Sequence, residues 1–554
     1  MAGAAGHLRE SLGAFRAVFA NANLRRLELA WAFSITGFFA YIVTLAVFAY
    51  EEGGAAAVGL VALIRVVPAL VFAPFVAGLG DRYPRERVML AVSLGRGVAM
   101  AATAAAALAD APELVVYALA VLVAVISSAF RPAQAALVPA LAATPEELTA
   151  ANVVATTIES VGVFIGPALA GLLLAAASTG VAFTAAAVLF FASALMAGRI
   201  RRPADGERTP SERKEGVTRS MLAGFRTIGL DRALRVIVGL YGAQLAVAGA
   251  LQVLIVVSSV ELLDLGEAGV GFLNSAIGIG GILGAVASVA LVGRQRLAMG
   301  FGVGLLLWGV PIALIGLVPE AAAALLLLAV VGVGNTVADV SALTLLQRSV
   351  PDEVLSRVFG VLQSVFVAGI GLGSIAAPLL IELIGVRGAL IATGALLPAL
   401  VALLWSRLRA IEAGAVVPER QLELLRAIPI FSPLPAATLE PLAARLAAAS
   451  FEPGAEIVRQ GARGDRFYVV DEGELEVVVD GRPATPLGPG GYFGEIALLR
   501  DVPRTATVTA RTGAQVYTLE RDEFIAAVTG DEASAEAAET VIGARLGSVR
   551  PGTA

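Results

Sequence analysis

Long apolar runs, separated by short charged stretches, fill the chain from about residue 24 to about residue 408. A helix needs roughly 20 apolar residues to cross the ~30 Å hydrocarbon core of a bilayer. The pattern therefore predicts an all-α membrane domain of twelve spanning helices, near residues 24–50, 55–79, 87–109, 113–140, 147–177, 180–198, 233–258, 268–292, 297–317, 321–347, 354–384 and 388–408.

The two halves of this region resemble each other. Pro145-Glu-Glu-Leu and Pro351-Asp-Glu-Val each follow one apolar run and open the next. Proline at the first helical position, with acids in the first turn, is typical of a helix start. The charged segment 199–232 lies between the copies. We therefore predict two six-helix repeats, an arrangement found in transporters that bind their substrate between the repeats.

The placement of arginines predicts an orientation. Arg387 is the one basic residue in the predicted outer loops, whereas arginines are frequent in the others. Basic residues accumulate on the cytoplasmic side of a membrane protein. We expect both termini in the cytoplasm and a multi-pass protein in the inner (cytoplasmic) membrane of a cell.

Composition supports the membrane assignment and excludes several kinds of site. Of 554 residues, 58% are hydrophobic and 15% charged, and the mean hydropathy is +0.83. Cysteine is absent and His7 is the single histidine, which excludes disulfide frameworks, Cys/His zinc sites and histidine-based triads. No nucleophile–base pattern appears either, so we expect neither an enzyme nor a metal or cofactor site.

The predicted loop between spans two and three reads Ala77-Gly-Leu-Gly-Asp81-Arg82-Tyr-Pro-Arg85-Glu-Arg87. Its glycines permit a tight turn, and its charges can bond neighbouring helix ends and hold one conformation closed. The loop resembles the signature of the major facilitator superfamily, in which Asp81, Arg82 and Arg85 match conserved charges. Ala77, Pro84 and Glu86 depart from that signature.

A second resemblance lies in span five, where Gly162-Val-Phe-Ile-Gly166-Pro167-Ala-Leu-Ala-Gly171 is similar to the glycine-proline pattern of the exporters of that superfamily. Small residues also allow close helix crossing in any membrane protein, so packing alone is an alternative reading. Together with the twelve runs and the repeat, the resemblance implies a secondary transporter, with proton-coupled efflux of a small molecule as the expected activity.

Charges within apolar spans are costly and often functional. Arg65, Glu159 and Asp339 lie deepest in their predicted spans, whereas Arg96 and Arg131 lie nearer the ends. We expect Glu159, or else Asp339, to take up and release a proton, with Arg65 as its partner or as an anion ligand. The alternative is a static buried ion pair.

Beyond residue 422 the pattern changes to short alternating runs separated by glycines, which predicts a small antiparallel β-barrel. Its central stretch contains Gly494, Glu495, Arg504 and Thr505. Glycine lets backbone approach a ligand, and the free amides of Ile496 and Ala497 can face an anion.

An arginine fork suits two phosphate oxygens, and a carboxylate accepts a hydroxyl. The stretch resembles the phosphate-binding cassette of cyclic nucleotide-binding domains of the catabolite activator protein type. That resemblance assigns Glu495 to the ribose 2′-hydroxyl, Arg504 to the cyclic phosphate, and the amides of Gly494 and Ala497 to ribose or phosphate. Thr505 occupies a position that differs between cyclic AMP and cyclic GMP binders; we expect cAMP in preference to cGMP.

The predicted domains are a transporter over 1–408, a linker over 409–421 and a nucleotide-binding domain over 422–554, whose tail offers Arg545 and Leu546 as caps for the base. The expected partners are a cyclic nucleotide, the lipid bilayer and a small-molecule substrate of unknown chemistry. No basic recognition helix follows, so we expect no nucleic acid. Two alternatives stay open: a membrane receptor without transport, and a transporter whose barrel has no regulatory effect.

Overall fold

The computed structural model describes residues 18–142, 144–200, 226, 228–229, 231–291, 297–350, 352–414, 419–434, 436–530 and 532–549. The chain divides into two compact units, Met1–Ala413 and Gly414–Ala554. The first is called the membrane unit below and the second the C-terminal unit.

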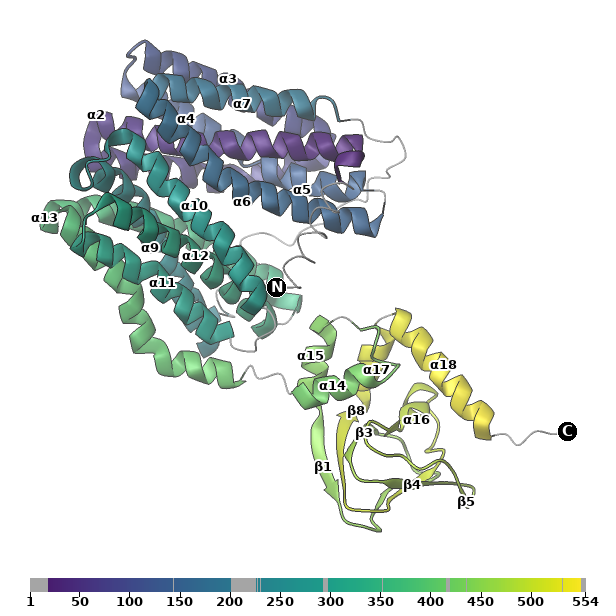
Figure 1. The fold of residues 1–554 in the computed structure, drawn as a ribbon. Coiled ribbons are helices and arrows are strands. Elements are labelled where there is room, and N and C mark those ends of the chain that lie inside the picture. Colours follow the sequence, from purple (N-terminus) through teal and green to yellow (C-terminus); the bar gives the residue numbers. More distant parts are fainter. Residues whose placement is uncertain are drawn as a thin grey trace. The chain divides into compact units, whose positions relative to one another are not determined.

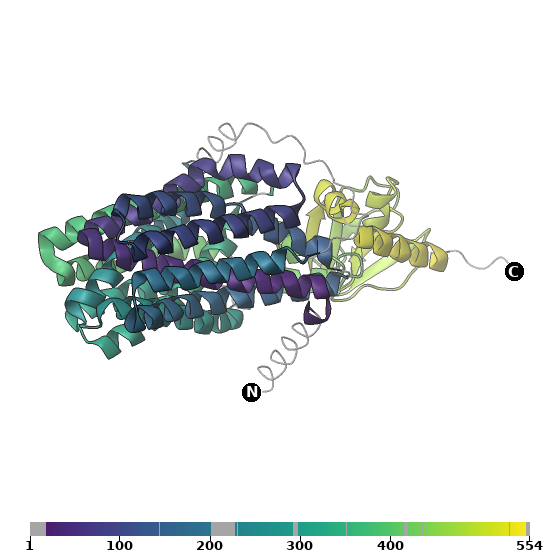
Figure 2. The ribbon, with the colours of Figure 1, turned by 90° about the horizontal axis from the view of Figure 1, so that it is seen from above.

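The membrane unit is helical, and its helices lie side by side along a common direction (Figures 1 and 2). Apolar residues dominate these helices around most of their circumference, as expected where lipid and neighbouring helices replace water. Their bounds are α2 Ala22–Arg82, α3 Arg85–Leu108, α4 Glu113–Ser127, α5 Phe130–Leu141, α6 Pro145–Ala176, α7 Thr179–Ala197, α9 Arg232–Val257, α10 Gly266–Leu291, α11 Leu297–Leu317, α12 Ala321–Ser349 and α13 Asp352–Gly414, with a π-helical turn η1 at Ser258–Leu262.

Within the described residues, ten helical stretches are long and apolar enough to cross a membrane. A helical membrane domain is therefore confirmed, while the number twelve stays a prediction. Two of the stretches contain sharp breaks: α2 departs from helical geometry at Gly53 and Gly54, and α13 does so at Gly385, where φ is 72°. Glycine tolerates such positive φ values without a Cβ clash.

The glycine-proline pattern of α6 lies where three helices meet. A Cβ on Gly166 would approach the Cβ of Phe39 in α2 to 2.7 Å, and one on Gly171 would approach the carbonyl oxygen of Ala268 in α10 to 2.8 Å. Both distances are too short for real contacts, so α6 needs glycine to cross α2 and α10 this closely. These contacts favour the packing reading of the pattern.

The C-terminal unit contains two four-stranded antiparallel sheets, ordered β1-β8-β3-β6 and β2-β7-β4-β5. The strands are β1 Ala447–Phe451, β2 Glu456–Val458, β3 Arg466–Glu472, β4 Leu475–Val479, β5 Arg482–Pro483, β6 Tyr492–Phe493, β7 Thr507–Ala510 and β8 Ala514–Glu520. The helices are α14 Glu419–Ala427, α15 Ala436–Arg445, α16 Glu495–Leu499, α17 Arg521–Thr529 and α18 Glu532–Val549.

The predicted closed barrel is therefore wrong, because the strands pair in two separate sheets. Alternation along each strand predicts a buried face but does not fix which strands become neighbours. One apolar cluster, with Tyr468, Phe493 and Val508, joins the inner faces of the two sheets. A second, centred on Phe431, Phe467 and Phe524, packs the helices on the outer face of β3 and β8. The short helix α16 follows directly from β6, which fixes its position over the sheet.

Candidate ligand-binding site

Gly494 joins β6 to α16 in a conformation that other residues rarely adopt. Its φ is 97°, in the left-handed region. A Cβ at this position would lie 2.6 Å from Nη1 of Arg504 and 2.9 Å from the carbonyl oxygen of Arg466. Glycine is thus required both for the turn and for the close approach of the arginine.

Arg504 is a buried cation beside this turn, only 4% exposed. Its Nη2 donates to the carbonyl oxygen of Arg466 at 2.8 Å and to Oδ1 of Asp465 at 3.3 Å, and its Nη1 donates to the carbonyl oxygen of Gly494 at 3.4 Å. Tyr468 lies below the guanidinium, 5.5 Å from ring centre to Cζ. A guanidinium has five N–H donors, so these bonds orient it while leaving donors for an anion.

Glu495 opens α16 and is 1% exposed. Its Oε1 accepts a hydrogen bond from Nη1 of Arg545 at 2.7 Å, while Oε2 is buried and has no hydrogen-bond partner among the described residues. Burial raises the pKa of the Glu495 carboxyl above its ordinary value of 4.5, and the Arg545 guanidinium opposes that rise. The site thus presents one carboxylate oxygen held by an arginine and one available to accept a hydrogen bond.

Arg545 comes from α18, fifty positions after Glu495. Its Nη2 donates to the carbonyl oxygen of Tyr492 at 3.0 Å, and its guanidinium lies over the Tyr492 ring, 4.4 Å from the centroid. The sequence suggested Arg545 as a cap for a base, but did not reveal its bond to Glu495. The side chain of Leu546, the other suggested cap, lies outside the described residues.

The remaining predicted ligand residues lie in α16 or in the loop that follows it. Ala497 is buried and Ile496 is half-buried in the first turn of α16, where amides have no acceptor within their own helix. Thr505 is exposed next to Arg504. Asp465, an acceptor for Arg504, was not predicted; its place after Gly464, just before β3, was its one sequence signal.

The predicted transport residues are not brought together. Oε2 of Glu159 in α6 pairs with Nη2 of Arg131 in α5 at 3.1 Å, and the two side chains are 32% and 70% exposed. Arg65 forms no ion pair with Glu159 or Asp339 among the described residues, so its expected partnership stays a prediction. Arg85 donates from Nη1 to the carbonyl oxygen of Ala136 in α5 at 2.8 Å. The side chains of Asp81 and Arg82, at the end of α2, lie outside the described residues.

Asp339 belongs to a network of neutral groups in the second half of the membrane unit. It accepts hydrogen bonds from Nε2 of Gln244 at 3.1 Å and from Nδ2 of Asn335 at 3.0 Å. Oδ1 of Asn335 in turn accepts from Nε1 of Trp308 at 3.0 Å. The network joins α9, α11 and α12 through one carboxylate.

The sequence pattern did not reveal how deeply two further charged side chains, Glu28 and Arg96, are buried. Glu28 is 0% exposed and both its carboxyl oxygens are buried without a hydrogen-bond partner among the described residues. Arg96 is 3% exposed; its Nη1 donates to Oγ of Ser34 at 2.9 Å, and its guanidinium lies 4.0 Å from the ring centre of Phe190. A charge near the end of an apolar run looks able to reach water, so its burial depends on neighbours that the run itself does not show.

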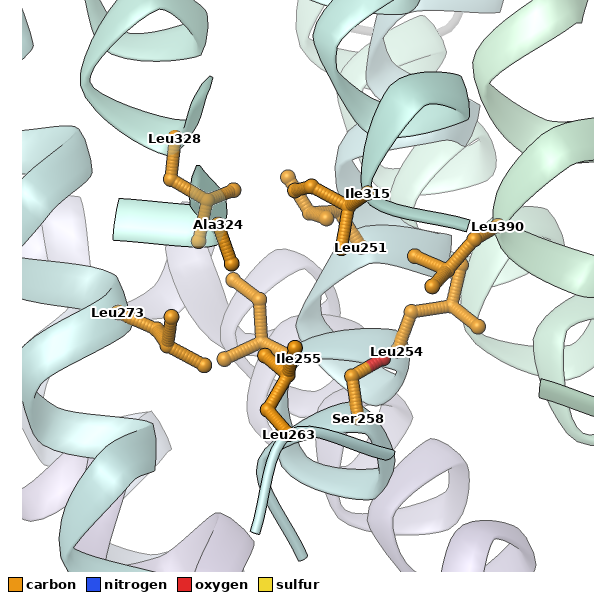
Figure 3. A pocket seen from close by; sticks show the side chains of 10 residues that line it. All are labelled: Leu251, Leu254, Ile255, Ser258, Leu263, Leu273, Ile315, Ala324, Leu328 and Leu390. Atoms are coloured by element: carbon orange, nitrogen blue, oxygen red, sulfur yellow. The ribbon is translucent and has the colours of Figure 1, made fainter. Parts of the chain in front are cut away.

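A small pocket lies within the second half of the membrane unit (Figure 3). Its walls come from α9, η1, α10, α11, α12 and α13, and Ser258 supplies the one polar side chain among those that line it. It contains none of the predicted transport residues. The other lining residues are Leu251, Leu254, Ile255, Leu263, Leu273, Ile315, Ala324, Leu328 and Leu390.

Two family models match the chain. The model described as Major Facilitator Superfamily matches residues 27–366, and the one described as Cyclic nucleotide-binding domain matches residues 448–531. The two matches fall in the membrane unit and in the C-terminal unit, respectively.

Individual relatives match the C-terminal part. The chain is 44% identical over 102 residues to the cAMP-dependent protein kinase regulatory subunit of Yarrowia lipolytica, covering 18% of this chain and 27% of that protein. The chain thus spans about a quarter of that curated relative.

Two solved structures are also similar to this part. The regulatory domain of Toxoplasma gondii PKA, crystallised with cAMP, is 29% identical and covers 24% of this chain and 54% of its own, with a TM-score of 0.22. The regulatory subunit of a cAMP-independent protein kinase A from Trypanosoma brucei is 27% identical and covers 24% and 46%, with a TM-score of 0.21.

Proposed function

This chain belongs to the Major Facilitator Superfamily and carries a cyclic nucleotide-binding domain in its C-terminal unit, and from this premise we propose that it is a secondary transporter whose activity is regulated by a cyclic nucleotide. The membrane unit carries out transport, and the C-terminal unit senses the nucleotide. The observation that carries the regulatory part is that one site holds a buried Arg504 and a buried Glu495, whose Oε2 has no hydrogen-bond partner among the described residues.

The chemistry of these groups matches a cyclic nucleotide. Its phosphodiester carries one negative charge, which suits the guanidinium of Arg504 and the amides at the start of α16. Its ribose keeps a 2′-hydroxyl, which suits the open Oε2 of Glu495. Because Arg545 occupies Oε1, the carboxyl is held in one orientation before the ligand arrives, and less free energy is spent on ordering it.

Cyclic AMP is the nucleotide we favour over cyclic GMP. The similarity to a cAMP-dependent kinase regulatory subunit, at 44% identity over 102 residues, supports this choice. Thr505 is exposed next to Arg504, and its hydroxyl is available to contact a purine substituent, so it is the residue that we expect to adjust the preference.

For the membrane unit we propose twelve crossings in two six-helix repeats. The breaks at Gly53–Gly54 and at Gly385 divide α2 and α13 into two stretches each, which raises the ten apolar stretches to twelve segments. With an even number of crossings and the arginine distribution of the loops, both termini lie in the cytoplasm and the protein resides in the inner membrane.

We propose export driven by a proton gradient as the mode of transport. Glu159 and Asp339 are the predicted proton carriers. Among the described residues Asp339 accepts hydrogen bonds from neutral amides alone, whereas Glu159 has the guanidinium of Arg131 as a counter-charge. A carboxylate without a cation changes its charge more readily on a change of environment, so Asp339 is the better placed of the two.

Two alternatives have a distinct observable outcome. One is a membrane receptor that signals through the C-terminal unit without transport; the other is a transporter on which the nucleotide has no effect. Proteoliposomes containing the full chain, with a proton gradient imposed, separate them. Ethidium and benzoate serve as apolar cationic and anionic probes, and cAMP is added on the protein's nucleotide-accessible side.

A flux of either probe that cAMP changes, and that Arg504→Ala renders insensitive to cAMP, supports regulated transport. Unchanged flux despite cAMP binding favours the non-regulatory alternative. Calorimetric cAMP binding without flux of either probe favours the receptor. Asp339→Asn is expected to abolish proton-driven flux while leaving cAMP binding unchanged, since Asp339 and Arg504 lie in different units.

A further inference from the structure

Glu28 lies in the second turn of α2 and is completely buried. Asn21 caps this helix, since its Oδ1 accepts from the amides of Asn23 and Leu24. Neither carboxyl oxygen of Glu28 has a hydrogen-bond partner among the described residues. A buried polar group in a folded protein is almost always paired, so this carboxyl needs an explanation.

The surroundings of Glu28 are apolar. The neighbouring buried side chains of α2 belong to one cluster with residues of α3, α5 and α6, and include Leu24, Leu27, Trp31, Met89, Phe130 and Leu137. Trp31 lies one turn beyond Glu28 on α2, and its ring stacks on Phe130 at 5.9 Å between centroids. The carboxyl is therefore in an environment of low polarity.

The charged groups on the elements around this end of α2 are bound elsewhere or exposed. On α2 itself, Arg25 donates to the carbonyl oxygen of Phe19 and Arg26 to that of Arg199. On α6, Glu147 accepts from Asn21, and Glu159 pairs with Arg131 of α5. Each of these charges is thus engaged with a group other than Glu28.

The remaining elements provide no described cation that is bonded to Glu28. On α3, Arg85 donates to the carbonyl oxygen of Ala136 and Arg96 donates to Ser34. Arg87 is exposed. Glu86 is half-buried, and its Oε2 is unpaired among the described residues. On α4, Glu113 bonds Tyr117; on α9, Arg232 and Arg235 are exposed; on α10, Glu267 lies in the first turn. Helix α7 contains no charged residue.

An ionised Glu28 in this setting is strongly disfavoured. The dehydration of an unpaired carboxylate is costly. The dipole at the start of α2 offsets only part of that cost and weakens beyond the first turn. The neutral acid avoids most of that cost, so the buried conformation selects the protonated form.

We propose that Glu28 is a proton-binding site of the membrane unit. This proposal rests on the proposed proton-coupled transport and adds a third carboxyl to Glu159 and Asp339. The proton is held on the Glu28 carboxyl while α2, α3, α5 and α6 close around it. When these helix ends separate, the carboxyl meets water, releases H⁺ to it and remains as the carboxylate. Closure is then favoured by protonation, because the closed conformation binds the proton more tightly.

Tryptophan emission provides a direct test in the full chain, without any substrate. The chain has 3 tryptophans, and in a Trp308→Phe, Trp405→Phe background Trp31 alone reports, one turn from Glu28. The emission of Trp31 is expected to titrate with pH. Glu28→Gln, which keeps the shape of the neutral acid, is expected to hold the low-pH spectrum over the whole range, a complete loss of the titration.

Glu147→Gln is the matched control, because Glu147 lies at the same end of the bundle but has Asn21 as a partner. It is expected to retain the titration. An unchanged titration in Glu28→Gln overturns the proposal. If Glu28→Gln does not fold, infrared spectroscopy of the unsubstituted protein tests the proposal instead. Its difference spectrum between low and high pH must show the loss of a protonated-carboxyl C=O band. That band must shift in Glu28→Asp. A band absent in the parent, or unmoved in Glu28→Asp, also overturns it.

This test is independent of the proposed function. Probe flux and calorimetric cAMP binding can fail while Trp31 still titrates through Glu28, and they can succeed while it does not. The two results therefore distinguish a failed proton site from a failed assignment of transport.

Discussion

Buried charged side chains have different kinds of neighbours in the two units. In the C-terminal unit, Arg504 donates to three acceptors and Glu495 pairs with Arg545. In the membrane unit, Glu28 has no partner among the described residues, and Arg96 lies among aromatic rings rather than carboxylates. Partners fix the position of a charge, whereas their absence makes the protonation state depend on conformation.

This difference indicates two kinds of site. A site for a small anionic ligand benefits from charges already held in place, because ligand binding then orders few side chains. A site that exchanges protons benefits from a carboxyl that is neutral when buried and ionised when wet. The predictions below test the first kind of site, from the largest expected effect to the smallest.

Arg504→Ala removes the cation that we propose meets the phosphate. Loss of one partner of a buried charge pair costs about 2–5 kcal/mol, so the dissociation constant for cAMP should rise roughly 30-fold to 4,000-fold. Calorimetry on the full chain measures the change. Arg459→Ala is the control, since Arg459 is 74% exposed and pairs with Glu456 away from the pocket; equal losses in the two variants would contradict the assignment.

Removal of the ribose 2′-hydroxyl tests the open oxygen of Glu495. A hydrogen bond to a charged group contributes about 1.5–3 kcal/mol, so 2′-deoxy-cAMP should bind roughly 10-fold to 150-fold more weakly than cAMP. Glu495→Gln should reduce that difference. If the wild-type chain binds both nucleotides equally, Glu495 does not contact the ribose.

The same carboxyl predicts a pH dependence. Burial raises the pKa of Glu495 above 4.5, and Arg545 partly offsets the rise. The ionised form accepts the hydroxyl and pairs with Arg545, so the preference for cAMP over 2′-deoxy-cAMP should be complete above that raised pKa and decline as the pH falls through it. Binding near this pH should release a proton, which calorimetry in buffers of different ionisation enthalpy detects.

Arg545→Ala tests the contribution of α18. The guanidinium is 34% exposed, so solvent screening reduces its interaction with Glu495, and we expect about 1 kcal/mol, or roughly a fivefold loss of cAMP affinity. Arg500→Ala is the control, because Arg500 pairs with Glu539 of the same helix between two exposed side chains. A loss in Arg500→Ala that matches the loss in Arg545→Ala would assign the effect to helix docking rather than to Glu495.

Thr505→Ala should have the smallest effect. Thr505 is exposed, and a neutral hydrogen bond contributes about 1 kcal/mol, so the ratio of cGMP to cAMP affinity should fall by roughly fivefold. Competition between the two nucleotides measures this ratio directly. An unchanged ratio would remove Thr505 from the pocket.

Local sequence patterns predicted much of this molecule. Apolar runs were sufficient for the helices, and the Gly494–Thr505 stretch holds the expected ligand residues in the turn at Gly494, in α16 and in the loop before β7. Contacts between distant positions were not predictable: Arg545 meets Glu495 from fifty residues away, and the strands form two sheets rather than a barrel. Glu28 was missed because its burial depends on α3, α5 and α6, not on its own run.

The central claim is that a nucleotide bound in the C-terminal unit changes the membrane unit. All three tryptophans, Trp31, Trp308 and Trp405, lie in the membrane unit, so tryptophan emission of the full chain reads that unit alone. We predict a saturable change in this emission on addition of cAMP, absent in Arg504→Ala. Calorimetric binding of cAMP without any change in emission would contradict the claim.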